Sequence, residues 1–318
     1  RLTCEMRDGR VTTSDTPRLG WQMSSPENGT RQTAYEIEIR DVWAGKVVWN
    51  SGKVKSAQSQ LVSCADAVLE KDRHYTWRVR VWDEADTPSA WSAPSDFSIL
   101  TSEAAFAGSE WIGAITRKDA RIPEGRKYHG SELKKPEAKA AWAAVDTLAK
   151  KSIYLRREFY VAKKVKDATA YVCGLGFYEF SLNGEKVGDS EFAPLWSDYD
   201  KSVYYNTYDV TSQVKKGGNA IGVLLGNGFY NVQGGRYRKL QISFGAPTLR
   251  FRMVVNYEDG TSETIVSGKD WKYDFSPVLF NCIYGGEDYD ARREQKGWNM
   301  FGFKEQDWHP VVIQEAPK

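Results

Sequence analysis

The stretch Ala170-Tyr-Val-Cys-Gly-Leu-Gly-Phe-Tyr-Glu-Phe-Ser-Leu-Asn-Gly-Glu-Lys-Val-Gly-Asp189 predicts a β-hairpin inside a sheet-rich domain. Its apolar residues Phe180, Leu182 and Val187 flank Asn183-Gly184. A two-residue type I′ turn needs residues that tolerate positive φ, and Asn-Gly is the strongest short signal for such a turn. The fold of the surrounding region is therefore expected to be organised around this hairpin.

Further strands follow the hairpin. Ala220 to Leu225 is an unbroken apolar run, typical of a strand buried on both faces, and Gly226-Asn-Gly228 ends it with turn residues. Two more hairpin strands, Thr248 to Tyr257 and Thr261 to Val266, are joined by an Asp-Gly turn. The apolar run at 311–313 is expected to pair with a strand at Trp111-Ile112.

The length of 318 residues predicts two domains. Residues 1–104 alternate strand patterns and turn clusters at the spacing of a β-sandwich, with Tyr35, Ile37 and Ile39 on one face of a strand. Residues 105–318 form the second domain after a small, polar linker from Ser102 to Ser109. An insertion at 117–152 interrupts its β pattern and is expected to carry one amphipathic helix from Pro136 to Lys150.

Composition excludes several classes of protein. Lys and Arg number 44 against 42 Asp and Glu, so there is no electrostatic case for nucleic acid or an anionic membrane. No apolar run reaches the length of a membrane span. The four cysteines form no C-x-x-C motif, and Cys4 and Cys64 either pair or serve as small buried apolar residues. Because residue 1 is Arg rather than Met, any targeting segment is expected to be missing.

Signatures of catalysis are lacking in the sequence. No G-x-S-x-G, H-E-x-x-H, P-loop or complete G-x-G-x-x-G motif occurs, and the three histidines are isolated. Neighbouring carboxylates at Asp198 with Asp200, and at Glu287, Asp288 and Asp290, are more often turn formers or ion-pair partners than a glycosidase pair. Twelve Trp and seventeen Tyr instead suit sugar binding, in which aromatic faces pack on the C–H face of a pyranose.

The motifs together resemble the N-terminal half of bacterial α-L-rhamnosidases, glycoside hydrolase family 78. The first domain carries Pro17-Arg-Leu-Gly-Trp21, Val48-Trp-Asn-Ser-Gly-Lys53 and Trp77-Arg-Val-Arg-Val-Trp-Asp83. The second carries these motifs: Gly174-Leu-Gly-Phe-Tyr-Glu179, Leu182-Asn-Gly184, Tyr208-Asp-Val-Thr211, Leu225-Gly-Asn-Gly228 and Tyr284-Gly-Gly-Glu-Asp-Tyr-Asp-Ala-Arg292. The resemblance implies an all-β chain, with a fibronectin III/immunoglobulin-like sandwich followed by a carbohydrate-binding-module-like jelly-roll sandwich.

The resemblance also implies a function. The family hydrolyses terminal α-L-rhamnosides by inversion, with carboxylates of an (α/α)6 barrel that lies C-terminal to these domains. This chain lacks that barrel, so we expect an accessory part that scaffolds the catalytic domain of the same polypeptide and binds rhamnose-containing glycans weakly. A periplasmic or extracellular location is expected, and no catalytic residue is carried over.

Some relatives bind rhamnose beside calcium in the jelly roll, and the resemblance carries both ligands to loop residues of this chain. The residues matched for sugar are Asn183, Trp196, Asn227 and Tyr230. Those matched for calcium are Asp198, Asn227 and Gln233. Two alternatives stay open at this point, a purely structural or interaction module without sugar binding and an intact enzyme with its active site in this chain.

Overall fold

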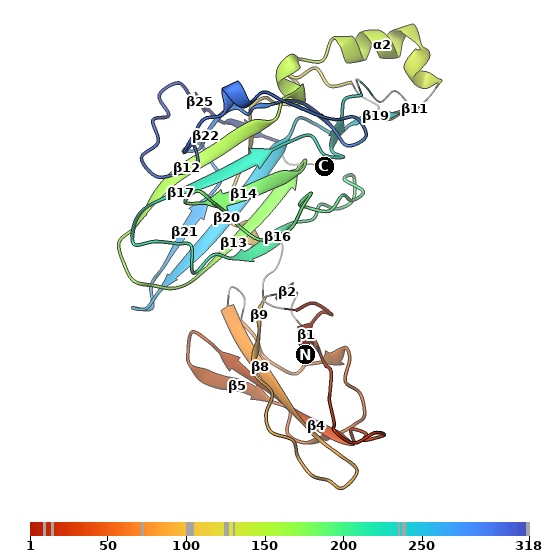
Figure 1. The fold of residues 1–318 in the computed structure, drawn as a ribbon, viewed down its shortest axis with the longest axis vertical. Helices are drawn as coiled ribbons and strands as arrows, with labels where there is room; N and C mark the ends of the chain where they lie inside the picture. Colours follow the sequence, from red (N-terminus) through yellow and green to blue (C-terminus); the bar gives the residue numbers. More distant parts are fainter. Residues whose placement is uncertain are drawn as a thin grey trace. The chain divides into compact units, whose positions relative to one another are not determined.

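The computed structural model describes residues 1–8, 11–13, 16–70, 73–99, 105–123, 127–129, 131–234, 236 and 240–315. The chain forms two compact units, residues 1–107 (the first unit) and residues 108–318 (the second unit). Both consist largely of β-strands (Figure 1), which confirms the predicted all-β class. The predicted boundary after residue 104 and the start of the predicted linker fall on residues 101–104, which lie outside the described part.

The first unit is a sandwich of two sheets. One sheet has the order β1-β3-β7, and the other has the order β2-β9-β8-β4-β5 with β6 beside β4. Their bounds are β1 Leu2–Cys4, β2 Val11–Thr13, β3 Arg18–Trp21, β4 Ala34–Asp41, β5 Lys46–Asn50, β6 Val54–Lys55, β7 Val62–Ser63, β8 Arg73–Trp82 and β9 Ser95–Ile99. Ile37 and Ile39 of β4 are fully buried. Glu38 lies between these isoleucines and ion-pairs with Arg78 of β8, and Glu36 precedes Ile37 and ion-pairs with Arg80. The predicted alternation of buried and charged residues is therefore confirmed.

The second unit is built on two larger antiparallel sheets. One runs β16-β13-β20-β10-β26 with β21 beside β20, and the other runs β15-β14-β17-β12-β22-β25. The bounds in the first are β10 Trp111–Gly113, β13 Val165–Leu175, β16 Asn206–Asp209, β20 Thr248–Tyr257, β21 Ser262–Val266 and β26 Val312–Gln314. Those in the second are β12 Ile153–Val161, β14 Tyr178–Leu182, β15 Glu185–Lys186, β17 Gly217–Leu225, β22 Lys272–Phe275 and β25 His309–Pro310. Their facing side chains form one apolar core, while the jelly-roll connection order stays a prediction.

Several predicted pairings are confirmed. Leu182 of β14 pairs with Glu185 of β15 across the predicted turn, where Asn183 and Gly184 have φ of 55° and 85°. The chain end also returns as predicted, because Ile112 of β10 pairs with Ile313 of β26.

Strand β17 is covered on both faces by different structures. Ile221, Val223 and Leu225 point into the core between the sheets. The other face carries Gly218, Ala220 and Gly222, since side chains alternate along a strand. Residues 295–308, which we call the strap, lie on this small-residue face: a Cβ at Gly222 would come within 2.8 Å of the Trp298 ring, and one at Gly218 would overlap the Phe301 ring.

Arg156 of β12 anchors the strap. Its side chain is fully buried, and its Nε donates to the carbonyl oxygen of Trp298 at 2.8 Å. The guanidinium also ion-pairs with Glu158 at 2.6 Å and with Glu305. Trp298 in turn stacks on Tyr154 with ring centroids 4.0 Å apart. The strap is therefore an ordered third layer over this part of the sheet.

The helical insertion differs from its prediction. The predicted helix is confirmed but does not reach Lys150: α2 spans only Pro136–Ala143, and a separate 3-10 turn, η2, spans Thr147–Lys150. The Asp146 carboxylate accepts a hydrogen bond from the backbone N–H of Leu148 and caps this second turn. Trp142 and Ala149 are still buried on one side, so the apolar pattern was a correct guide to burial but not to helix continuity.

The remaining elements are short. They are β11 Lys127–His129, η1 Glu132–Lys134, β18 Asn231–Val232, β19 Leu240–Ser243, β23 Val278–Cys282, β24 Gly286–Tyr289 and η3 Ala291–Arg293. Strands β11, β19 and β18 make a small sheet, and β23 pairs with β24 as a hairpin. Among the described residues, no helix is long and apolar enough to cross a membrane.

Candidate functional site

A cluster of solvent-exposed rings lies on the loops of the second unit. We call it the aromatic surface and define it by Phe177, Phe192, Trp196, Phe229 and Tyr284. Phe192, Trp196 and Tyr284 are 69%, 62% and 49% exposed. Phe229 is the hub, since its ring centroid lies 5.5 Å from Trp196, 5.8 Å from Tyr284 and 6.3 Å from Phe177. Such a patch is a candidate binding surface, because a folded domain rarely leaves contiguous rings uncovered.

Two glycine-rich turns hold the central rings in place. Phe177 follows Gly176, whose φ of 127° is accessible only to glycine at low cost. Phe229 follows Gly228, where a Cβ would lie 2.8 Å from the backbone nitrogen of Phe177. The N–H of Gly226 donates to the carbonyl oxygen of Phe177 at 2.8 Å. The two turns therefore pack backbone against backbone and fix the positions of both rings.

A groove of about 580 Å³ adjoins the aromatic surface. Phe177 and Phe192 form one side, and the β23–β24 hairpin with Asn281 and Glu287 forms another. Its volume is within the range of about 300–1,000 Å³ typical of small-molecule sites. Tyr178 in the groove is buried, and burial raises its pKa well above the ordinary value. Its hydroxyl contacts Tyr208 at 3.0 Å, so Tyr178 is a neutral structural side chain rather than a source of phenolate.

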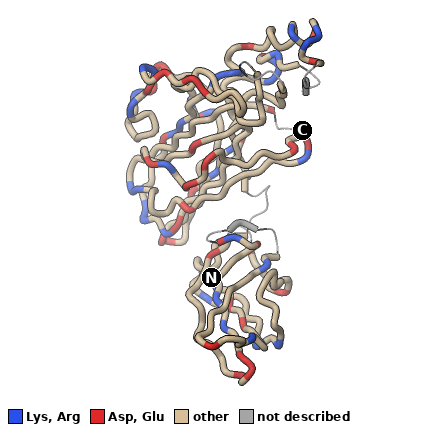
Figure 2. The backbone as a smooth tube through the Cα atoms, turned by 45° about the vertical axis from the view of Figure 1, so that its right-hand side comes forward, with Lys and Arg blue, Asp and Glu red and all other residues tan. Residues whose placement is uncertain are grey.

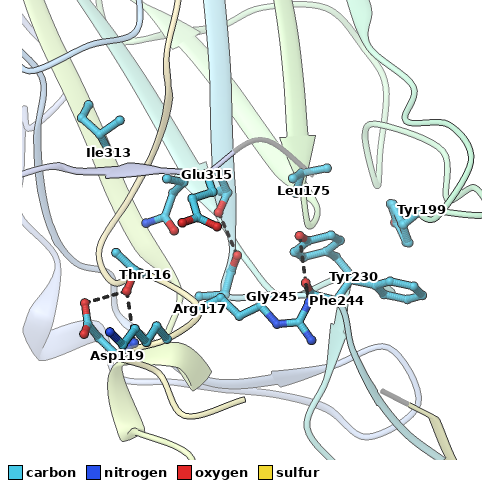
Figure 3. A pocket seen from close by; sticks show the side chains of 14 residues that line it. Thr116, Arg117, Asp119, Leu175, Tyr199, Tyr230, Phe244, Gly245, Ile313 and Glu315 are labelled. Atoms are coloured by element: carbon cyan, nitrogen blue, oxygen red, sulfur yellow. Dashed lines mark hydrogen bonds between the residues drawn. The ribbon is translucent and has the colours of Figure 1, made fainter. Parts of the chain in front are cut away.

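A second cavity, of about 430 Å³, is lined in part by Tyr199 and Tyr230, which follow Trp196 and Phe229 closely in the sequence (Figure 3). Tyr199, Tyr230 and Phe244 line one side of it, and the turn from Thr116 to Asp119 lines another. Tyr230 is thus a cavity residue whose hydroxyl donates to the carbonyl oxygen of Phe244 at 3.2 Å. Burial raises the pKa of Tyr199 to about 12, so this phenol also stays neutral.

The two predicted asparagines lie at opposite ends of β17. The side-chain oxygen of Asn183 accepts from the N–H of Ala220 at 2.9 Å, and its amide donates to Asn219 at 2.8 Å. Asn227 follows the far end of the strand, roughly 20 Å away at about 3.3 Å per residue. Asn183 therefore does not share a site with Trp196 and Asn227, and its amide serves the hairpin.

Asn227 lies beneath the aromatic surface rather than on it. Its residue is only 1% exposed. Its amide donates to the carbonyl oxygens of Lys150 at 3.1 Å and Asn281 at 3.3 Å, and its side-chain oxygen accepts from Asn231 at 2.8 Å. These bonds tie the insertion and the β23–β24 hairpin to the loop after β17. Asn227 thus supports the groove from below.

Comparison with known families matches both units. A model described as "Rha78A-like, N-terminal immunoglobulin domain" matches residues 1–100, and one described as "Alpha-L-rhamnosidase N-terminal domain" matches residues 163–318. The chain carries the two N-terminal domains of α-L-rhamnosidases. An α-L-rhamnosidase of Formosa agariphila is 36% identical over an alignment of 309 positions, which covers 93% of this chain and 31% of that relative. The chain thus spans about a third of that protein's length.

Solved rhamnosidases have the same fold. The α-L-rhamnosidase of Dictyoglumus thermophilum aligns with 99% of this chain and 34% of its own, with 31% identity and a TM-score of 0.77. That of Streptomyces avermitilis, solved in complex with L-rhamnose, aligns with all of this chain and 45% of its own, with 27% identity and a TM-score of 0.81. The family resemblance drawn from the sequence is therefore confirmed for the N-terminal domains.

Three of the five neighbouring carboxylates singled out in the sequence, Asp198, Asp288 and Asp290, have ordinary structural partners. Asp288 accepts two bonds from Arg236, and Asp290 caps η3 while pairing with Arg292, which lowers the pKa of the Asp290 carboxyl. Asp198 ion-pairs with Lys201 at 3.0 Å. Charges of both signs are spread over each unit (Figure 2). These contacts agree with the interpretation of the carboxylates as turn and ion-pair residues.

Calcium fits the three residues predicted for it poorly. Calcium takes about six to eight oxygen ligands, with carboxylates prominent among them. Asp198 is engaged by Lys201, and Asn227 Oδ1 is buried and accepts from Asn231. Gln233 donates from its amide to Asn231 and leaves its buried Oε1 without a hydrogen-bond partner. The Gln233 Oε1 oxygen is a suitable calcium ligand. The described residues, however, contain no group of three or more acidic, His or Cys side chains that could complete the coordination. Calcium binding stays a prediction.

Four rings of the aromatic surface were not predicted as site residues from the sequence. Phe177, Phe229 and Tyr284 each lie in or beside a glycine motif that was recognised for its turn chemistry, and Phe192 precedes Ala193-Pro194. The available signal was an aromatic residue next to a turn glycine, a position where a side chain cannot join the core of a strand. Of the predicted sugar-binding residues, Trp196 alone lies in the aromatic surface.

Proposed function

We propose that this chain is the accessory N-terminal part of an enzyme that hydrolyses terminal α-L-rhamnosyl residues, and that it binds rhamnose-containing glycans weakly at the aromatic surface. The proposal of binding rests on one observation, the exposed rings around Phe229, which lie beside a groove large enough for a small ligand. Family membership supports the sugar class, and the relative from Streptomyces avermitilis was solved with L-rhamnose.

The chemistry of the ligand suits this surface. L-Rhamnose carries a methyl group where most hexoses carry a hydroxymethyl group, so one edge of the ring is apolar. That edge and the C–H face pack on Trp196 and Phe192, while Glu179, Asn281 and Glu287 offer acceptors and donors at the groove for the hydroxyls. Few polar groups beside an open apolar surface favour weak binding.

The catalytic step belongs to other domains of the polypeptide in this proposal. An inverting enzyme needs one carboxylic acid and one carboxylate on opposite sides of the glycosidic bond. Asp198, Asp288 and Asp290 are ion-paired or cap a turn, and we assign none of them to catalysis. The second unit supports the catalytic domain, and the whole protein acts in the periplasm or outside the cell.

A titration with one variant and one control tests the binding proposal. L-Rhamnose and a rhamnose-terminated disaccharide are titrated by calorimetry, with calcium and with a chelator, and Trp196→Ala is expected to reduce binding at least tenfold. Tyr160→Ala is the control, because Tyr160 is 65% exposed at the opposite end of β12 from the groove. Equal binding by Trp196→Ala and the unaltered chain would rule out the aromatic surface.

The alternative is a purely structural module, and the same titration decides it. If neither sugar binds with or without calcium, only the scaffold role survives. Hydrolysis of an aryl α-L-rhamnoside by residues 1–318 alone would contradict the assignment of catalysis to other domains.

A further inference from the structure

We propose that the 430 Å³ cavity behind the aromatic surface is a second ligand site, which takes a single neutral monosaccharide. It is separate from the site of the proposed function and does not depend on it. Figure 3 shows the side chains that converge on the cavity from segments far apart in the sequence.

One wall of the cavity is aromatic and rigid. The ring centroids of Tyr199 and Tyr230 lie 5.2 Å apart, and those of Tyr199 and Phe244 also lie 5.2 Å apart. All three residues are nearly buried, yet they line the cavity. Gly245 makes this packing possible, because a Cβ there would lie 2.8 Å from the Tyr230 hydroxyl oxygen. A fixed aromatic wall suits the C–H face of a pyranose.

The facing wall is polar, and hydrogen bonds hold Thr116, Arg117 and Asp119 in it. Thr116 and Asp119 close a turn through a 2.6 Å hydrogen bond between their side chains, and the N–H of Asp119 donates back to Thr116 Oγ1 at 3.1 Å. This turn is followed by Ala120, which is buried in the small core under the insertion. From the turn, Arg117 Nη1 reaches the carbonyl oxygen of Phe244 at 3.3 Å. The guanidinium is thereby held beside the aromatic wall.

The charges around the cavity indicate a neutral ligand. Arg117 and Lys118 supply two positive charges, and Asp119 and Glu315 supply two negative charges. Two carboxylates would repel an acidic ligand and two cations would repel a basic one, so neither gains a net attraction. A neutral polyol gains from both signs, because cations donate to hydroxyl oxygens and carboxylates accept from hydroxyl hydrogens. A single hexose also suits a cavity near the lower end of the range of about 300–1,000 Å³ for ligand sites.

The cavity and the aromatic surface use neighbouring residues of the same loops. Trp196 and Phe229 belong to the aromatic surface, whereas Tyr199 and Tyr230, a few residues on, line the cavity. Each loop thus contributes to two sites that do not share a side chain. Variants can therefore remove one site and leave the other.

The test uses the residue 1–318 chain carrying Trp196→Ala, which lacks one exposed ring of the aromatic surface. L-Rhamnose, D-galactose, D-glucose and D-mannose are titrated separately to tens of millimolar while backbone amide signals are followed by NMR. We expect at least one sugar to shift the amides of Leu175, Arg117 and Gly245 in a saturable way. No saturable shift of these amides with any of the four sugars overturns the proposal.

Two variants and a charged probe sharpen the result. Arg117→Ala is expected to weaken the saturable shifts about tenfold, the loss of one charge-assisted hydrogen bond, and Gly245→Ala is expected to abolish them by displacing Tyr230. Lys163→Ala, which removes an exposed cation from the Asp259 turn, is expected to change nothing. Undiminished shifts in a folded Arg117→Ala protein, or tighter binding of D-glucuronate than of D-glucose, contradict a neutral-sugar site.

Discussion

The backbone of Gly176 lies directly against the carbonyl group of Gly226, and a Cβ at position 176 would overlap that oxygen. This contact joins the turn between β13 and β14 to the loop that follows β17. It sets the distance between Phe177 and Phe229 and thus the geometry of the aromatic surface.

Gly176→Ala is therefore expected to destabilise the second unit by about 3 kcal/mol, from strain at positive φ together with the overlap. Gly260→Ala is the matched control. Gly260 also has positive φ, of 85°, but a Cβ there would meet nothing within 4 Å, so only the strain of about 1 kcal/mol is expected. Urea unfolding followed by tryptophan fluorescence measures both, and equal losses would contradict the role given to the Gly226 contact.

Arg156→Ala is expected to release the strap and to cost about 3 kcal/mol, because Glu158 and Glu305 lose a fully buried partner. Amide hydrogen exchange should then rise across residues 295–308 while β13 and β20 stay protected. Lys272→Ala is the control, since Lys272 pairs with the same Glu305 at 3.0 Å from a 40% exposed position. Comparable exchange in both variants would mean that Arg156 does not anchor the strap.

Asn227→Ala is expected to act on stability rather than on a ligand. It leaves the carbonyl oxygens of Lys150 and Asn281 and the amide of Asn231 without their partner, at a cost of about 3 kcal/mol. Asn50→Ala, which removes one exposed hydrogen bond to Glu36, is expected to cost under about 0.5 kcal/mol. Thermal unfolding compares the two, and an Asn227→Ala protein as stable as Asn50→Ala would place Asn227 outside the supporting network.

The four cysteines are free and buried. Burial raises the pKa of Cys4, Cys64 and Cys173 to about 12 in each case. Since the reactive form is the thiolate, these thiols are expected to stay inert to an aromatic disulfide reagent at pH 8 and to react once the chain is unfolded in guanidinium. Fast labelling of the native protein at pH 8, located by mass spectrometry to one of these three residues, would contradict the buried positions.

Much of the fold was predictable because local chemistry decided it. Asn183-Gly184 required a hairpin turn, and the alternation of Ile37 and Ile39 with charged residues required a half-buried strand. The insertion was less predictable, because Asp146 starts a new turn with a side-chain hydrogen bond in the middle of a helical pattern. The spacing of apolar residues predicts which side of a segment is buried. It does not predict a side-chain hydrogen bond, such as that of Asp146, which ends the helical pattern and starts a new turn.

The candidate site was predictable only in part. Trp196 was identified as a residue of the aromatic surface. Asn183 and Asn227 were assigned to one site because both lie in loops, but β17 separates the two loops. A turn Asn looks the same in sequence whether its amide faces a ligand or its own backbone. An Asn side chain in a loop is unavailable to a ligand when it already hydrogen-bonds to residues far away in the sequence, as Asn227 does to Lys150 and Asn281. A local sequence pattern does not contain these long-range partners.

The strap also has a consequence for how this rhamnosidase segment can be divided. The two sheets look complete without residues 295–308, yet Gly218, Ala220 and Gly222 leave β17 with only small residues where the strap covers it. A protein shortened to the two sheets would present bare main chain and the ring of Tyr154 to water and would lose the partners of Arg156 as well. The smallest portion that can be excised as a stable, soluble domain must therefore extend past Trp308, and past β26 to keep the strand that pairs with Ile112.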